Sequence, residues 1–270
     1  MSPDAFRRLG HEMVDWIATY MDRVGSMPVT PAVAPGDIAR MVPMHPPEAG
    51  ASDAWGDVFN DLDTIITPGL THWQHPGFFA YFPCNASGPA ILAEMLSAGL
   101  NVNGMLWSTG PAITELETRM LDWCAELFGL PDRFRSTGTG GGVIQGTASE
   151  AAVLAIIAAK RRAGLGASAD GSKPGRVIAS GEAHSSIAKA AMVAGLASGP
   201  DDDRAITLMP PGDGQGRGRD LDRLAETLAD PSRPTPIMIA ATIGTTATGA
   251  VDDVPGIAAV LDRYAERPDA

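Results

Sequence analysis

Hydrophobic residues recur at helical spacing over the first 20 residues of the chain. Apolar and aromatic side chains fall every three or four positions, with charged residues between them: Phe6, Leu9, Met13, Trp16, Ile17 and Tyr20. This period predicts an amphipathic helix. Prolines crowd the next segment, 28–47, which predicts an extended connector because proline interrupts both helices and central strands. A second helix is expected over about 53–66, before Pro68-Gly69.

The N-terminal segments offer few apolar positions for a core of their own. We therefore expect residues 1–85 to form an arm that lies across another surface, such as a partner subunit. The end of this arm is the aromatic peak of the sequence, with five of the fifteen aromatic residues within 73–82.

The pattern changes beyond this arm. Helical periodicity predicts helices over 89–100 and 111–128, and from residue 138 short apolar runs alternate with helical patterns. Strands are expected over 176–180, 205–209 and 236–242, and helices over 149–162, 185–197, 221–228 and 254–265. Such alternation is typical of βαβ units, so we expect an α/β domain over 86–270 with a mostly parallel sheet and right-handed crossovers.

Composition excludes several classes of protein. The 270 residues carry a net charge of −12 and are 44% hydrophobic, which is typical of a globular protein and disfavours nucleic acid or an anionic membrane as partner. The two cysteines, Cys84 and Cys124, form neither a disulfide framework nor a metal knuckle. The longest apolar run, 151–159, is too short to span a bilayer, and no signal peptide is apparent, so a cytoplasmic location is expected.

A glycine-rich segment, 138–146, precedes the helix expected over 149–162. Thr147 and Glu150 have capping-box spacing, and the free N–H groups of such a helix start, with the hydroxyls of Thr147 and Ser149, suit a phosphate. The alternative is a flexible turn followed by an ordinary cap. The segment is neither a Walker loop nor a dinucleotide fingerprint.

Two polar segments follow expected strands. His184 comes after the strand 176–180, and Gly244-Thr245-Thr246 follows the strand 236–242. Ligands of open α/β sheets bind beyond the carboxyl ends of strands, so this histidine could stack on a flat ring or move protons. The alternative is a helix-start histidine bonded to nearby backbone. For Asp252 and Asp253, a helix cap is favoured over a site role.

His72 and His75 flank Trp73 and Gln74. Their spacing could suit a metal, but no third ligand is evident and Pro76 breaks any helix, so no metal site is expected. The segment is better interpreted as an aromatic wall for a substrate, although aromatic residues also fill cores.

Together these segments resemble the group II pyridoxal 5'-phosphate (PLP)-dependent amino acid decarboxylases, in particular the aromatic-L-amino-acid (DOPA/tryptophan) decarboxylase branch. The matching motifs are Phe6-Arg7-Arg8, Met13-Val14-Asp15, Pro68-Gly69-Leu70-Thr71-His72-Trp73, Phe78-Phe79-Ala80-Tyr81-Phe82-Pro83, Thr114-Glu115-Leu116-Glu117, Asp122-Trp123, the run 140–150, Ala183-His184-Ser185-Ser186 and Ala241-Thr242-Ile243-Gly244-Thr245-Thr246. They cover the whole chain in order.

The resemblance implies fold type I and a homodimer whose N-terminal helices wrap the other subunit. It implies that residues 86–270 form part of the PLP-binding large domain. By residue, it implies three groups: phosphate binding by Thr147, Ala148 and Ser149; contacts to the cofactor ring by His184 and Thr246, with His184 as the catalytic residue; and a substrate pocket lined by Trp73, Tyr81, Phe82 and Cys84. The implied reaction releases CO2 from an aromatic L-amino acid and gives the amine, with PLP as the electron sink.

Some positions depart from the family pattern. Cys84 stands where the family commonly has Thr, and Asn103 and Met105 replace an apolar residue and a Phe. The substrate therefore stays open among the aromatic amino acids, as does the choice between decarboxylase and the related aldehyde-forming enzymes.

The family's Schiff-base lysine and its pyridine-binding Asp have no counterpart in the sequence. The three lysines, Lys160, Lys173 and Lys189, do not match the lysine motif. We expect a chain truncated before that lysine. It is either an incomplete sequence of a longer enzyme or one half of a split enzyme that a second polypeptide completes. Activity is expected only when the missing C-terminal portion is supplied. The alternatives are a non-catalytic dimerising module and, with less support, a nucleotide-binding α/β protein. An incomplete sheet would leave an apolar edge that favours association.

Overall fold

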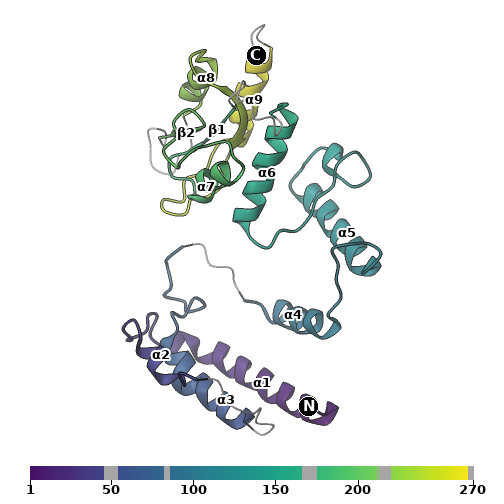
Figure 1. Ribbon diagram of the computed structural model, residues 1–270, viewed down its shortest axis with the longest axis vertical. Coiled ribbons are helices and arrows are strands. Elements are labelled where there is room, and N and C mark those ends of the chain that lie inside the picture. Colours follow the sequence, from purple (N-terminus) through teal and green to yellow (C-terminus); the bar gives the residue numbers. More distant parts are fainter. Residues whose placement is uncertain (46–53, 82–85, 166–174, 211, 213–219, 267–270) are drawn as a thin grey trace. The chain divides into compact units, whose positions relative to one another are not determined.

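The computed structural model describes residues 1–45, 54–81, 86–165, 175–210, 212 and 220–266 (Figure 1). The chain forms two compact units, Met1–Leu100 and Asn101–Ala270.

The first unit is helical. It contains α1 (Pro3–Arg23), α2 (Asp37–Met41), α3 (Trp55–Asp61) and α4 (Gly88–Leu100). Ser2 caps the start of α1, because its hydroxyl accepts the N–H of Ala5 at 3.1 Å. The helices expected at the N-terminus and over 89–100 are confirmed. The helix expected over 53–66 is α-helical over Trp55–Asp61 and continues as a π-helical turn, Leu62–Ile66.

The proline-rich connector is not extended throughout. The short helix α2 lies within it, between Pro35 and Pro43, so the expectation of a wholly extended segment was wrong. Between these two prolines every residue can donate its backbone N–H. Asp37 supports the turn because its carboxylate accepts the N–H of Ala34 at 2.7 Å, and Gly36 supplies the left-handed φ of +92° before the helix.

The second unit carries the predicted alternation of helices and strands. In chain order its elements are α5 (Pro111–Leu127), α6 (Ala148–Arg162), β1 (Gly175–Ser180), α7 (Ser186–Val193), β2 (Ile206–Met209), α8 (Leu221–Ala229), β3 (Thr235–Ala240) and α9 (Val254–Ala265). The three strands form one parallel sheet in the order β2-β1-β3. The expected parallel sheet is confirmed, with β1 at its centre.

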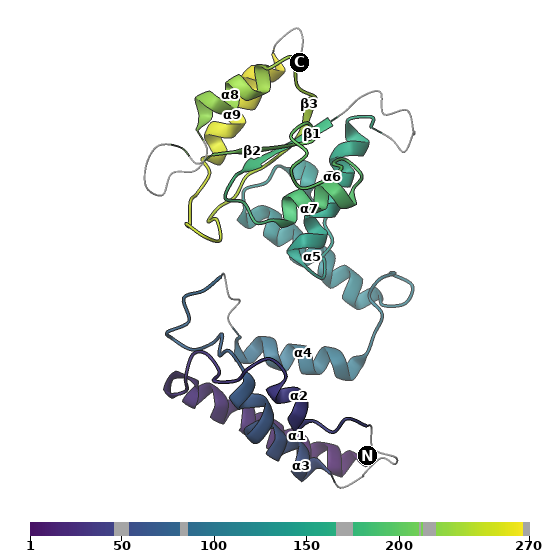
Figure 2. The same cartoon turned by 60° about the vertical axis from the view of Figure 1, so that its left-hand side comes forward.

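Helices cover both faces of this sheet (Figure 2). Val177 of β1 packs with α6 and α7 in a buried cluster that includes Ile156 and Ala191. Its neighbour Ile178 points to the other face and packs with Leu224 of α8 and the residues of α9. Successive side chains of a strand alternate between faces, so one apolar run in β1 supplies both cores.

Candidate cofactor site

The candidate site lies at the carboxyl edge of the sheet in the second unit. Because β1 and β3 are adjacent and parallel, the loops that follow them leave the sheet at the same edge. The helix α6 also begins there. Lys160, near the end of α6, donates to the carbonyl oxygens of Ala194 (2.6 Å) and Gly195 (3.3 Å) at the end of α7, so the two helices run in the same direction. The start of α7 directly follows β1, and the start of α6 therefore lies at the carboxyl edge as well (Figure 1).

The start of α6 forms a complete capping box. The Thr147 hydroxyl accepts the N–H of Glu150 at 3.1 Å, and the Glu150 carboxylate accepts the N–H of Thr147 at 3.1 Å. Within the described part of the chain, this arrangement leaves the first-turn N–H groups of Ala148 and Ser149 without an intramolecular acceptor. The ordinary cap is therefore present, and two donors are still directed toward the carboxyl edge.

His184 lies in the loop between β1 and α7, and its side chain is exposed. Its Nδ1 accepts the N–H of Ser186 at 3.2 Å. A nitrogen that accepts a hydrogen bond carries no proton, so in this arrangement the proton of the neutral ring is on Nε2. The local backbone bond considered as the alternative for His184 is thus present. It fixes one edge of the exposed ring.

The loop after β3 is closed on itself. Thr245 is buried, its N–H donates to the carbonyl of Ala250 at 2.9 Å, and its hydroxyl accepts the N–H of Ala250 at 3.0 Å. This turn leaves the neighbouring Thr246 exposed at the edge of the sheet.

The two aspartates that follow have different roles. Asp253 caps α9, because its carboxylate accepts the N–H of Gly256 at 3.0 Å, and this prediction is confirmed. The helix cap predicted for Asp252 was wrong. That residue is buried and its carboxylate accepts the N–H of Thr242 at 2.9 Å, since the chain pairs with itself across the turn.

A further side-chain link at this edge was not anticipated from the sequence. The Thr248 hydroxyl donates to the carboxylate of Glu182, and the hydroxyl oxygens of Thr245 and Thr248 are 2.8 Å apart. Glu182 lies two residues before His184, and Thr248 two residues after Thr246. The run of threonines over 242–248 was the available signal, but no pattern in the sequence pairs one of them with Glu182.

The aromatic segment lies in the first unit. Trp73 stacks on Tyr81, with ring centroids 5.6 Å apart and an interplanar angle of 9°, and on Phe78 at 5.0 Å. Tyr81 has a left-handed φ of +61°, which is uncommon for a bulky residue and often marks a functional constraint. Phe82 and Cys84 lie outside the described residues.

His72 and His75 each use Nδ1 in a hydrogen bond within the protein. Nδ1 of the buried His72 and the Tyr20 hydroxyl are 2.8 Å apart and share a hydrogen bond, whereas His75 Nδ1 accepts the N–H of Gly77 at 2.8 Å. Burial also raises the pKa of Tyr20. In the described residues, no group of three or more potential ligands could hold a metal ion. Among the helices that the structure describes, none combines the length and the apolar character that crossing a bilayer requires.

Comparison with known proteins gives the same family as the sequence motifs. The pattern of the "Pyridoxal-dependent decarboxylase conserved domain" matches residues 35–266. Tryptophan decarboxylase 2 of Oryza sativa is 39% identical over 261 residues, covering 94% of this chain and 50% of the relative. Phenylacetaldehyde synthase of Arabidopsis thaliana is 37% identical over 270 residues, covering 97% of this chain and 52% of the relative.

A solved structure agrees with these relatives. The tryptophan decarboxylase of Catharanthus roseus, in complex with L-tryptophan, superposes with a TM-score of 0.88 at 34% identity, covering 98% of this chain and 54% of that chain. The predicted fold class, the fold type I α/β arrangement, is thereby confirmed. The chain spans about half the length of the relatives it matches. On this match over most of its length, the chain belongs to the pyridoxal-dependent decarboxylase family.

Proposed function

We propose that the protein catalyses PLP-dependent decarboxylation of an aromatic L-amino acid, releasing CO2 and the amine. Membership of the family supports the cofactor and the reaction class. The observation that carries the proposal is the convergence at one edge of the sheet of three segments: the start of α6, the loop of His184 and the loop of Thr246.

The residues at this edge fit the cofactor. The N–H groups of Ala148 and Ser149, at the positive end of the α6 dipole, are donors for a phosphate, and the Thr147 and Ser149 hydroxyls lie in the same turn. The Glu150 carboxylate is engaged by the N–H of Thr147. Thr147, Ala148 and Ser149 are therefore proposed to hold the phosphate of PLP.

His184 and Thr246 are proposed to contact the cofactor ring. The exposed imidazole, oriented through its Nδ1, can lie against a flat aromatic system, and its protonated Nε2 can donate a hydrogen bond. The exposed hydroxyl of Thr246 can bond a ring substituent. When bound, PLP supplies an electron sink for the pair of electrons left when CO2 departs, while these side chains orient the reacting groups.

The aromatic stack is proposed to recognise the substrate. Trp73 and Tyr81, together with Phe82 and Cys84, would form an apolar pocket that holds an aromatic side chain and excludes water. Three of the four are aromatic residues, which favours an aromatic over an acidic or aliphatic substrate.

Turnover is proposed to need a lysine from further polypeptide, either the same chain extended or a second chain. Lys160 is bound to the α7 carbonyls, at the opposite end of α6 from the phosphate donors, and Lys189 is exposed on α7. Lys173 lies outside the described residues. In sequence, none of the three matches the lysine motif of the family.

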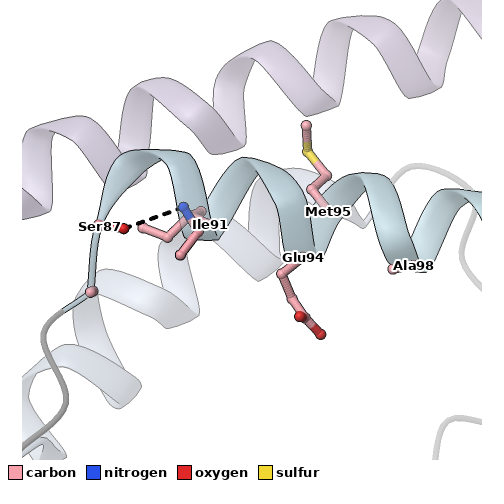
Figure 3. A pocket seen from close by; sticks show the side chains of 7 residues that line it. Ser87, Ile91, Glu94, Met95 and Ala98 are labelled. Carbon is pink, nitrogen blue, oxygen red and sulfur yellow. Dashed lines mark hydrogen bonds between the residues drawn. The ribbon is translucent and has the colours of Figure 1, made fainter. Parts of the chain in front are cut away.

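A homodimer is proposed as the working assembly, with residues 1–85 as the arm and residues 86–270 as part of the cofactor-binding domain. In α4, the apolar side chains of Leu92, Leu96 and Leu100 are all more than half exposed. A groove of about 420 Å³ along this helix is lined by Ile91, Met95 and Ala98 among others, and contains none of the proposed site residues (Figure 3). Apolar surface of this kind is typical of protein interfaces.

A product assay tests the proposal. The protein, expressed from its complete gene and loaded with PLP, is offered L-tryptophan, L-tyrosine, L-DOPA and L-phenylalanine, with L-glutamate and L-alanine as controls. We expect CO2 and the amine from at least one aromatic amino acid. His184→Ala should lower the rate by about a hundredfold or more, whereas His11→Ala, on the exposed face of α1, should leave it unchanged.

Other outcomes of this assay would contradict the proposal. Preference for L-glutamate or L-alanine would overturn the substrate class. An aldehyde in place of the amine as the product would overturn simple decarboxylation in favour of the activity named for the Arabidopsis relative.

A further inference from the structure

The two loops of the proposed cofactor site are joined by side chains beyond the end of the sheet. The last paired residues of β1 and β3 are Ala179 and Ala240. Past this pair, the loop of His184 and the loop of Thr246 are connected by the hydrogen bond between Glu182 and Thr248.

The direction of each hydrogen bond in this link follows from which of the groups carries a proton. A carboxylate accepts only, so the single hydroxyl proton of Thr248 is donated to Glu182. The contact of 2.8 Å between the Thr245 and Thr248 hydroxyls must then use the proton of Thr245. The oxygen of Thr245 still accepts the N–H of Ala250. The result is a directed chain from the buried backbone of one loop to a charged acceptor on the other, and such charge-assisted bonds are stronger than neutral ones.

Each end of the chain is anchored in a rigid turn. On the β3 side, Gly249 donates its N–H to the carbonyl of Thr245 at 2.8 Å and has a left-handed φ of +69°. On the β1 side, Glu182 and Ala183 donate their N–H groups to the hydroxyl and the carbonyl of Ser180, at 3.2 and 3.0 Å. A bond between two rigid turns fixes the position of one turn relative to the other.

Electrostatics argues against a direct ligand role for Glu182. A carboxylate beside the proposed site would repel the phosphate of the cofactor. The Glu182 carboxylate instead accepts a hydrogen bond from the Thr248 hydroxyl, so its charge is engaged within the protein.

We propose that Glu182 and Thr248 are positioning residues that lock the loop after β1 to the loop after β3, so that His184 and Thr246 are held in a fixed mutual position at the cofactor site. This inference rests on the proposed function for what the two loops bind. The link itself depends only on the contacts of this chain.

The test compares Thr248→Val, which keeps the shape of the side chain and removes its hydroxyl, with Thr235→Val. Thr235 is exposed at the amino end of β3, whereas Thr248 lies in the loop beyond the carboxyl end of that strand, so Thr235→Val is the same substitution away from the link. Glu182→Gln retains an oxygen that can accept from Thr248, and Glu182→Ala does not. The probe is pyridoxamine 5'-phosphate, which carries the ring and phosphate and needs no lysine for binding.

Two measurements are made on each variant. Calorimetric titration should show binding about tenfold weaker for Thr248→Val and Glu182→Ala, a smaller loss for Glu182→Gln and no change for Thr235→Val. Hydrogen exchange of the ligand-free protein should show faster exchange of the amides of 182–186 in Thr248→Val, with exchange in β1 unchanged.

The outcomes separate the inference from the proposed function. Wild-type binding with an unchanged affinity in Thr248→Val would overturn the inference alone, as would unchanged exchange in 182–186. Absence of binding to the wild-type protein would overturn the proposed function and the cofactor part of the inference. Faster exchange spread evenly over the second unit would show a general loss of stability and would overturn a positioning role.

Discussion

The two units of the chain are stabilised in different ways. In the described part of the first unit, two apolar residues, Leu9 and Val24, are buried. The described part of the second unit buries fifteen, most of them in the two clusters that pack on the faces of the sheet. In the first unit, polar and aromatic contacts join the elements instead: Trp16 donates to Asp63 at 3.1 Å and stacks on Tyr20, and Tyr20 bonds His72.

This difference explains where the proposed chemistry lies. A sheet with a core on both faces can hold the segments at its edge in fixed positions. The proposed ring contacts are on two such loops, and the proposed phosphate contacts are at the start of α6. The described part of the first unit has no such core, and its helices α1 and α4 leave apolar side chains exposed, including Phe6 and Leu96. Its aromatic stack is therefore expected to reach full stability only against another surface, as the proposed dimer would provide.

The largest expected effect is a difference between the units in the stability that is lost when one leucine is replaced by alanine. Leu224→Ala empties a fully buried position between α8 and the sheet and should lower the free energy of unfolding by about 3–5 kcal/mol. Leu9→Ala should cost at most about 2 kcal/mol, because no cluster of buried apolar neighbours surrounds Leu9 in the described residues. Urea denaturation measures both. Equal losses would contradict the contrast between the units.

The sequence predicted the features of the fold that follow from a regular spacing of residue types along the chain. The alternation of apolar runs and helical patterns was sufficient for the parallel sheet, and the Thr147–Glu150 spacing was sufficient for the capping box. Contacts between distant side chains have no period. Tyr20 and His72 are 52 positions apart, and Glu182 and Thr248 are 66 apart, so neither pair could be recognised before the fold brought it together.

Arg176 shows the same limit within a correctly predicted strand. The charged side chain of this strand residue is fully buried and donates to the carbonyl of Thr227, near the end of α8. Local sequence predicted the strand, whereas the helix that covers this residue comes from a segment about 50 positions away.

The next effect concerns the polar contacts of the first unit. Tyr20→Phe removes the bond to buried His72 and should cost about 1–2 kcal/mol, because it leaves an imidazole nitrogen without its partner. Tyr81 is 69% exposed, so Tyr81→Phe should change the free energy of unfolding by no more than about 0.5 kcal/mol. Urea denaturation followed by tryptophan fluorescence measures both variants.

The pH dependence of the same variant sharpens this test. Since burial raises the pKa of Tyr20 above its unfolded value, its contribution to stability is complete below about pH 10 and is lost as the pH rises through the folded pKa. Tyr20→Phe should remove that alkaline loss. An unchanged alkaline profile in Tyr20→Phe would show that the hydroxyl does not couple to folding.

A smaller effect compares the two helix caps. Ser2→Ala and Thr147→Ala each remove an N-cap acceptor and should each cost about 1 kcal/mol. Thr147→Ala alone should also weaken binding of pyridoxamine 5'-phosphate, because Thr147 lies at the proposed phosphate site. Thr147→Ser keeps the hydroxyl and should restore both stability and affinity. Equal affinity in Thr147→Ala and Ser2→Ala would remove Thr147 from the proposed site.

The smallest expected effect concerns α5. This helix belongs to the second unit, but it exposes Trp123 and Leu127 much as α4 of the first unit exposes its leucines. A polar contact joins α5 to the following segment: the Ser136 hydroxyl and N–H donate to the Asp122 carboxylate at 2.6 and 2.8 Å, and these bonds hold the pKa of Asp122 below its ordinary value. A carboxyl group whose pKa is lowered by folding stabilises the protein above the unfolded pKa of about 4, and this contribution is lost as the pH falls toward the folded pKa.

Asp122→Asn should therefore flatten the acid side of the stability profile measured by urea denaturation between pH 3 and 7. Asp57→Asn, at an exposed position in α3, serves as the control, and an equal flattening there would mean that the acid response does not come from the α5 contact.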